Sequence, residues 1–251
     1  MAEFRRPSHV RVGRLLERMD GEFLERAKCY FGGGTALALA HGEYRESRDI
    51  DFLVSSRSGI RMIRETVAPG SLGKIFREPV MLVREVVSDR DAVRTYVTDD
   101  PSAAPVKLEI VYEARIELEG AMAAALGVPV LGAAHAVAEK LLANADRGTD
   151  GFFHSRDVID LAFVSLDLDE DALNEGLALA QAAYGETVLK SLNEALRKLE
   201  IDAKYRAQCL DQLLIEPSAA KRLREGLAKL RALKRGVASA SARSRTRMKL
   251  S

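Results

Sequence analysis

The sequence predicts an α+β protein whose first half mixes strands with helices and whose second half is helical. Two observations predict this class. Runs rich in Val and Ile, such as Val93–Thr98 and Val106–Ile116, are typical of strands and occur up to about residue 120. Beyond that point apolar residues recur at spacings of three and four, as at Val137, Leu141 and Leu142, which is typical of amphipathic helices.

In the first half, β-branched runs alternate with segments rich in helix-forming Ala and Leu. Strands are expected over residues 27–32, 50–55, 80–87, 93–98 and 106–116, and helices over 35–41 and 60–67. In the second half, glycines at 151 and 185 separate long helical patterns. Helices are expected there over residues 133–146, 155–166, 170–184, 186–199, 202–214 and 218–235.

These patterns divide the chain into an α/β domain over residues 1–120 and a helical domain over residues 121–235. The remaining residues, 236–251, form a small, polar and basic tail that is expected to be disordered. From Lys221 to Ser251 the chain carries eleven Lys or Arg residues and a single acid, although its formal net charge is only +1. A basic end on an acidic body suits a polyanion partner, or it serves only as a solubilising tail.

Composition excludes several classes of protein. Hydrophobic residues make up 47% and charged residues 30% of the 251 positions, which is ordinary for a globular chain with a real core. No stretch approaches 18 uncharged apolar residues, and no apolar run follows the N-terminus, so neither a membrane span nor a signal peptide is expected. Cys29 and Cys209 lie in unrelated segments and are expected to be free thiols of a cytoplasmic protein.

Asp49 and Asp51 are the first candidate for chemistry. Residues two apart in a strand face the same way, about 6–7 Å apart at ~3.3 Å per residue, so the two carboxylates would repel each other. A cation relieves that repulsion, and oxygen ligands suit Mg²⁺ or Mn²⁺. Ile50 and Phe52 would face the core. The alternative is a charged outer face of an edge strand.

Gly33, Gly34 and Thr35 are the second candidate, because they lie between an expected strand and an expected helix. A helix N-terminus offers unpaired N–H groups and a partial positive charge, and glycine lets a phosphate approach the backbone. Thr35 is expected to cap the helix and to supply a hydroxyl donor. A capped tight turn without a ligand is the alternative, since neither a Walker loop nor a GxGxxG spacing is present.

Glu109 is the third candidate, an acid between Leu108 and Ile110 in the strand-like run. Taken alone it is consistent with ordinary alternation, because Lys107 and Val111 would share its face. Glu113 and Glu117 have the same parity and stay open as alternatives for a third acid; the two apolar neighbours favour Glu109.

Together, the Gly-Gly turn, the acid pair and the later acid resemble the polymerase-beta-like nucleotidyltransferase superfamily. The longer patterns resemble the AbiEii/AbiGii toxin family of nucleotidyltransferases more closely, over roughly residues 25–165. The four motifs that carry this resemblance are Gly33-Gly34-Thr35-Ala36-Leu37, Asp49-Ile50-Asp51-Phe52, Glu139-Lys140-Leu141 and Arg156-Asp157-Val158-Ile159-Asp160-Leu161.

The resemblance implies a nucleotidyltransferase-type mixed sheet with flanking helices, followed by a helical bundle that completes the active site. It implies that Asp49, Asp51 and Glu109 hold Mg²⁺ or Mn²⁺ in a two-metal site. It implies further that Gly33, Gly34 and Thr35 cradle the phosphates of an NTP, that Lys140 neutralises phosphate charge, and that Asp157 lines the same site. A Lys140–Asp157 salt bridge between packed helices is the structural alternative, and Asp160 is expected to be structural.

The activity implied is transfer of NMP from an NTP to an acceptor hydroxyl, with RNA or tRNA as the acceptor. The protein would then be the toxin of a toxin–antitoxin or phage-defence system, with a cognate antitoxin as partner. Three alternatives stay open: a small-molecule nucleotidyltransferase that needs no basic surface, a non-catalytic module that binds nucleotide or RNA, and a nuclease. The Gly-Gly turn favours a bound triphosphate over hydrolysis.

Overall fold

The computed structural model describes residues 3–147 and 155–232, and the expected basic tail lies outside them. The chain divides into two compact units, one ending at Ala136 and the other beginning at Val137. The expected domain boundary near residue 120 therefore falls too early, because two further strands at 120–123 and 128–131 join the sheet of the first unit.

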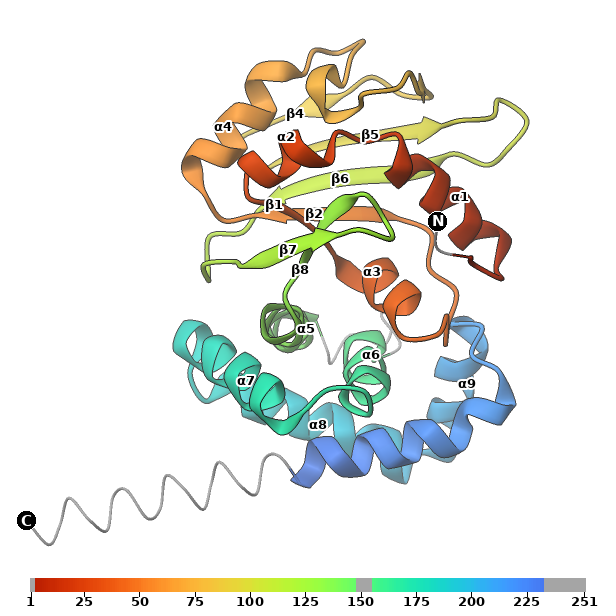
Figure 1. The fold of residues 1–251 in the computed structure, drawn as a ribbon. Helices are drawn as coiled ribbons and strands as arrows, with labels where there is room; N and C mark the ends of the chain where they lie inside the picture. The colour runs from red at the N-terminus through yellow and green to blue at the C-terminus, as the bar shows by residue number, and fades with distance from the viewer. Residues whose placement is uncertain (1–2, 148–154, 233–251) are drawn as a thin grey trace, which may run out of the picture. The chain divides into compact units, whose positions relative to one another are not determined.

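The first unit is built on a mixed sheet in the order β3-β5-β6-β2-β1-β8-β7, with β4 also paired to β5 (Figure 1). Strand β2 runs parallel to β6 and β1 runs parallel to β8, while the other pairs are antiparallel. The strands are β1 (Cys29–Gly32), β2 (Ile50–Val54), β3 (Met81–Leu82), β4 (Val87–Ser88), β5 (Ala92–Thr98), β6 (Val106–Tyr112), β7 (Gly120–Ala123) and β8 (Val128–Leu131).

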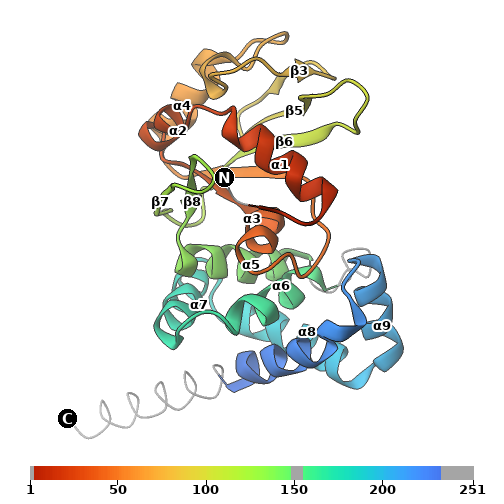
Figure 2. The same ribbon diagram turned by 45° about the vertical axis from the view of Figure 1, so that its right-hand side comes forward.

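Helices α1 (Pro7–Glu17), α2 (Gly21–Arg26) and α4 (Arg57–Thr66) pack against the apolar face of this sheet (Figures 1 and 2), and Ala36 and Leu39 of α3 (Gly33–Ala40) belong to the same apolar cluster. On β2, Ile50, Phe52 and Val54 are buried while Asp51 and Leu53 are half-buried, as a strand with one core face requires. Leu residues of the first two helices and Ile residues of α4 join the same core cluster. The helices of this unit are α1 (Pro7–Glu17), α2 (Gly21–Arg26), α3 (Gly33–Ala40) and α4 (Arg57–Thr66), with a 3-10 turn, η1 (Gly73–Ile75).

The second unit is helical. Its helix α6 is buried from Asp157 to Ser165, and the helical residues 220–232 approach it so closely that a Cβ on Gly226 would lie 2.0 Å from the carbonyl oxygen of Ala162. Lys229 Nζ donates to the carbonyl oxygen of Leu168 at 2.8 Å. The elements are α5 (Ala133–Arg147), which begins in the first unit, α6 (Arg156–Ser165), α7 (Glu170–Tyr184), α8 (Thr187–Ile201), α9 (Ala203–Gln212) and the 3-10 turn η3 (Pro217–Ala219).

The α+β class, with a mixed sheet, flanking helices and C-terminal helices, is confirmed. The single strand expected over residues 80–87 is wrong, because two short strands, β3 and β4, pair with β5 there instead. Between them the chain leaves β5, and the N–H of Val86 donates to the carbonyl oxygen of Pro69 at 2.8 Å. Both cysteines are buried free thiols, as expected. Among the described residues, no helix combines the length and apolar character that a membrane crossing requires.

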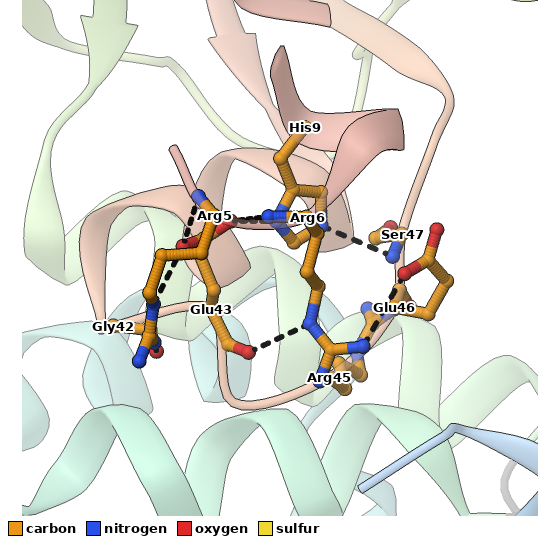
Figure 3. A network of polar contacts seen from close by, with 8 residues as sticks. All are labelled: Arg5, Arg6, His9, Gly42, Glu43, Arg45, Glu46 and Ser47. Atoms are coloured by element: carbon orange, nitrogen blue, oxygen red, sulfur yellow. Dashed lines mark hydrogen bonds and ion pairs between the residues drawn. The ribbon is translucent and has the colours of Figure 1, made fainter. Parts of the chain in front are cut away.

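A buried carboxylate, Glu43, fixes the turn between α3 and β2 (Figure 3). Its oxygens accept the backbone N–H groups of Arg5 at 2.9 Å and Arg6 at 3.0 Å, and they contact His9 Nδ1 at 2.8 Å. Burial alone would raise the pKa of Glu43, but these hydrogen bonds outweigh burial and lower the pKa to about 2. The N-terminal segment is therefore tied to the turn that leads into Asp49 and β2.

This anchor generates a pH prediction. Because the folded-state pKa of Glu43 is depressed, its contribution to stability is present above the unfolded pKa near 4.5 and is lost as the pH falls towards 2. We expect Glu43→Gln to lower the free energy of unfolding by about 3 kcal/mol at pH 7 and by progressively less below pH 4, in urea titrations. The exposed Glu65→Gln serves as control and should change little at any pH. If the loss of unfolding free energy in Glu43→Gln stayed constant down to pH 3, the lowered pKa of Glu43 would be contradicted.

Close backbone packing at Gly59 generates a second prediction. A Cβ there would lie 2.0 Å from the carbonyl oxygen of Ala27, whereas a Cβ on Gly70 would meet nothing within 4 Å. At a helix position with free space around it, Gly→Ala stabilises the protein by up to about 1 kcal/mol. A loss of stability in Gly59→Ala would therefore come from the close contact with the Ala27 backbone. We expect Gly59→Ala to destabilise by about 3 kcal/mol and Gly70→Ala by less than about 0.5 kcal/mol, measured by urea unfolding. Equal stabilities of the two variants would show that α4 does not pack this closely.

Candidate active site

The turn from β1 into α3 forms one wall of the candidate site. The strand ends at Gly32 and the helix begins at Gly33, which has φ +70°. A residue with a side chain pays about 1–2 kcal/mol for that conformation. A Cβ at Gly33 would also lie 2.7 Å from Oδ2 of Asp51. Glycine is therefore required here both for the backbone conformation and to make room for the Asp51 carboxylate.

Gly34 and Thr35 follow in the first turn of α3, where backbone N–H groups have no partner within the helix. The expectation that Thr35 caps the helix is wrong: Gly32 occupies the N-cap position, and no side chain caps it. Thr35 is instead fully buried, and its Oγ1 lies 2.8 Å from Oγ of Ser47. Since the N-terminal turn carries partial positive charge, the nearby Asp51 carboxylate is electrostatically favoured there.

The acid pair straddles the beginning of β2. Asp51 lies within the strand, and Asp49 lies just before it and is exposed. In register, Asp51 pairs with Gly32 on antiparallel β1 and with Glu109 on parallel β6. The sheet thus places Gly32, Asp51 and Glu109 in one row across three neighbouring strands.

Glu109 ends that row between two cations. Its Oε1 accepts Arg94 Nε at 2.5 Å and its Oε2 accepts Lys107 Nζ at 2.6 Å. Burial alone would raise the pKa of Glu109, but these hydrogen bonds and charges hold it below its ordinary value. The alternative acid Glu113 lies beyond the end of β6 and bonds Arg115, so the register favours Glu109 as the neighbour of Asp51.

The pKa of Lys107 indicates how strongly the three acids attract a cation. Burial alone would lower the pKa of Lys107, but its hydrogen bond to Glu109 and the negative charges of Glu109, Asp51 and Asp49 raise it. All three expected acids therefore act on a single cation, and a set of carboxylate oxygens fits Mg²⁺ or Mn²⁺. Within residues 3–147 and 155–232, no three His, Cys, Asp or Glu side chains are already grouped as metal ligands. Each oxygen of Glu109 already accepts a hydrogen bond, from Arg94 or from Lys107, so a metal at Glu109 would compete with these two cations.

The helical motifs form a buried cluster within the second unit. Lys140 Nζ lies 3.0 Å from Oδ1 of Asp157 and 2.7 Å from Oδ2 of Asp160. Arg147 Nε lies 3.1 Å from Oδ2 of Asp157. Burial alone would raise the pKa of Asp157, but the charges of Lys140 and Arg147 hold it below its ordinary value. The salt bridge considered as an alternative role for this pair is thus present.

Three polar residues of the first unit were not among the sequence candidates: Arg94, Lys107 and Ser47. Lys107 could have been found, because it lies two residues before Glu109 on the same strand face. Arg94 could not, because it reaches Glu109 only through the long-range pairing of β5 with β6. Ser47 contacts Thr35 across a twelve-residue separation that no local pattern indicates.

Comparisons with known proteins show the family and the fold of the chain. Residues 14–229 match the family described as the nucleotidyl transferase AbiEii toxin of type IV toxin–antitoxin systems. A crystal structure from H. pylori, assigned as a nucleotidyltransferase, shares the fold with a TM-score of 0.50 at 20% identity, over 91% of this chain and 96% of that one. JHP933 from Helicobacter pylori is 18% identical with a TM-score of 0.41, over 92% of this chain and 100% of that one. No curated protein matches the chain.

The two glycines at φ +70°, Gly33 and Gly127, provide a matched test of the site. A Cβ at Gly127 would meet nothing within 4 Å, whereas at Gly33 it would meet Asp51. Both Gly→Ala variants should lose about 1–2 kcal/mol of stability from backbone strain. Only Gly33→Ala should also weaken Mn²⁺ binding, by about tenfold or more, in a calorimetric titration of the folded protein. If both variants bound Mn²⁺ with equal affinity, Asp51 would not be a ligand of the bound Mn²⁺.

Proposed function

The chain belongs to the AbiEii family of nucleotidyltransferase toxins of type IV toxin–antitoxin systems, and we propose that it transfers NMP from an NTP to a hydroxyl group of RNA. The observation that carries this proposal is the row of Gly32, Asp51 and Glu109 across three strands, beside the open start of α3. A phosphate-binding helix start next to acidic residues is what nucleotidyl transfer requires, since charge must be neutralised on both the attacking and the leaving oxygen.

In this proposal Asp49, Asp51 and Glu109 hold the divalent cations, Mg²⁺ or Mn²⁺. Bound there, the cations would supply the charge neutralisation that a triphosphate needs. The backbone N–H groups at Gly33 and Gly34 would donate to phosphate oxygens, which only residues without a side chain allow at close range. During transfer, a bond forms between the acceptor oxygen and the α-phosphorus, the bond from the α-phosphorus to pyrophosphate breaks, pyrophosphate leaves, and the acceptor hydroxyl proton passes to water.

The surroundings of Glu109 favour its ionised form. Because its pKa is held below the ordinary value, it is a carboxylate at neutral pH, and a carboxylate can orient the acceptor hydroxyl by accepting its hydrogen bond. Lys107 and Arg94 balance its charge while no other cation is bound. We propose that they give up part of this contact when the metal is bound.

The roles of Lys140 and Asp157 rest on the family motifs. Lys140 would neutralise phosphate charge as a point charge, and Asp157 would orient it, because the two side chains are already ion-paired. Asp160 would hold the same ammonium from its fully buried position. The proposed setting is the cytoplasm, where NTPs and tRNA are available, with a cognate antitoxin as the protein partner.

Transfer of label tests the proposal. Purified protein is incubated with each α-³²P-labelled NTP, Mg²⁺ and total tRNA, and labelled RNA is resolved on a denaturing gel. We expect wild type to label tRNA, and Asp51→Asn to reduce the rate by about a hundredfold or more, because several kcal/mol of charge stabilisation are lost. Asp171→Asn on the exposed first turn of α7 is the control and should retain the wild-type rate.

The pattern of failure distinguishes the alternatives. Metal-dependent NTP binding without labelled RNA would redirect the search to a small-molecule or protein acceptor. Binding without any transfer would indicate a non-catalytic module, and shortened RNA would indicate a nuclease. If Asp51→Asn kept the wild-type rate, the proposed site would be wrong. Removal of residues 236–251 should slow transfer to tRNA if the basic end contributes phosphate contacts.

A further inference from the structure

A partly buried relay of hydrogen bonds, formed by Glu43, His9, Ser47 and Thr35, connects the N-terminal helix to the start of α3. Thr35 Oγ1, in the first turn of α3, lies 2.8 Å from Oγ of Ser47, which comes two residues before Asp49. The N–H of Ser47 donates to Nε2 of His9 at 3.3 Å, and Nδ1 of His9 lies 2.8 Å from Oε1 of Glu43 (Figure 3). The contacts run without interruption from Glu43 through His9 and Ser47 to Thr35.

The two hydrogen-bond partners of His9, Glu43 and the Ser47 N–H, determine which of its ring nitrogens carries the proton. A backbone N–H can only donate, so Nε2 must be the acceptor towards Ser47. The Glu43 carboxylate, whose pKa is lowered to about 2, can only accept, so Nδ1 must carry the proton. The neutral tautomer with its hydrogen on Nδ1 is therefore the one that satisfies both neighbours. Each ring nitrogen of His9 is committed to one partner.

We propose that His9 is a positioning residue for the triphosphate cradle. His9 is fully buried, so it acts through Ser47 rather than by touching a substrate. The hydrogen bond to His9 fixes the Ser47 backbone, and therefore the position of the Ser47 hydroxyl relative to Thr35. This contact in turn sets the distance between the first turn of α3 and the segment that leads through Asp49 into β2. This inference rests on the proposed function, because it assigns the cradle to an NTP.

The anchoring of the relay supports a positioning role over simple core filling. An apolar side chain could fill a buried site without any hydrogen bonds, whereas His9 binds a carboxylate that is itself held by the backbone of Arg5 and Arg6. Such a satisfied polar network rigidifies its members, since each partner restricts the orientation of the next. The rigid end of the relay is Glu43, and the end nearest the phosphate-binding turn is Thr35.

Two amide substitutions separate the two hydrogen bonds of His9. In His9→Asn, the side-chain amide corresponds to Nδ1 and can still donate to Glu43, but nothing accepts the Ser47 N–H. In His9→Gln, the amide reaches the position of Nε2 and can accept from Ser47. We expect His9→Asn to raise KM for NTP about tenfold, the loss of one hydrogen bond, with kcat within about threefold of wild type. His9→Gln should restore KM to within about threefold of wild type.

Ser47→Ala provides a second variant and a test of coupling. It cuts the contact with Thr35 without disturbing His9, so it should raise KM about as much as His9→Asn does. If the two residues act along one path, the double variant should have a KM no higher than the worse single variant. Multiplied effects in the double variant would overturn the relay. Ser47→Ala with a wild-type KM would overturn it as well, even if the His9 variants failed to fold.

Binding of a non-hydrolysable NTP analogue with Mn²⁺, measured by calorimetry, separates this inference from the proposed function. If wild type transferred no nucleotide but bound the analogue, the proposed reaction would fail while the tenfold loss of affinity in His9→Asn still tested the relay. If wild type transferred nucleotide and His9→Asn matched it in both KM and analogue affinity, the relay would be wrong and the function would stand. A lower Tm with unchanged KM and affinity would leave His9 as a structural residue only.

Discussion

The pairing of β2 with its two neighbours is the constraint on which the candidate site depends. Side chains alternate along a strand, so a slip of one residue would turn Asp51 into the core and Phe52 out of it. Phe52 is buried in the main apolar cluster, 5.5 Å from the ring of Phe31, and this packing holds the register. Burial of the apolar side chains thus places Asp51 beside Glu109 on one side and against the turn at Gly33 on the other. The geometry of the acids follows from hydrophobic packing.

Charge balance explains why the acids can gather without unfolding the sheet. Glu109 is compensated by Arg94 and Lys107, and the positive charge of Lys107 is also felt by Asp51 and Asp49. Like charges this close raise the free energy of the folded state unless cations accompany them. In the proposed function a divalent cation would compensate the same negative charge as Lys107 does, so metal binding would be coupled to a rearrangement of Glu109. In the second unit, the charges of two buried aspartates, Asp157 and Asp160, are compensated by Lys140, which contacts both of them.

Much of this arrangement could be predicted from local sequence. The apolar alternation at Ile50 and Phe52 and the bounds of α7 needed only short windows. The hairpin of β7 and β8 could not be predicted, because β7 (GAMA) contains no β-branched residue and β8 (VPVL) is short and holds Pro129, so both strands depend on their pairing. Helix α1 was missed although Pro7 at its first turn is a usual start signal. The partners of Glu109 and the His9 relay depend on contacts between distant segments, which no local period encodes.

A crystal structure with Mn²⁺ and a non-hydrolysable NTP analogue would test the central claim most directly, because anomalous scattering locates the metal independently of the protein. We expect Mn²⁺ to be bound by Asp49 and Asp51, the triphosphate to lie against the backbone of Gly33 and Gly34, and Glu109 to be released from Lys107 or Arg94. Mn²⁺ bound away from Asp51, or a triphosphate that does not contact the start of α3, would contradict the central claim.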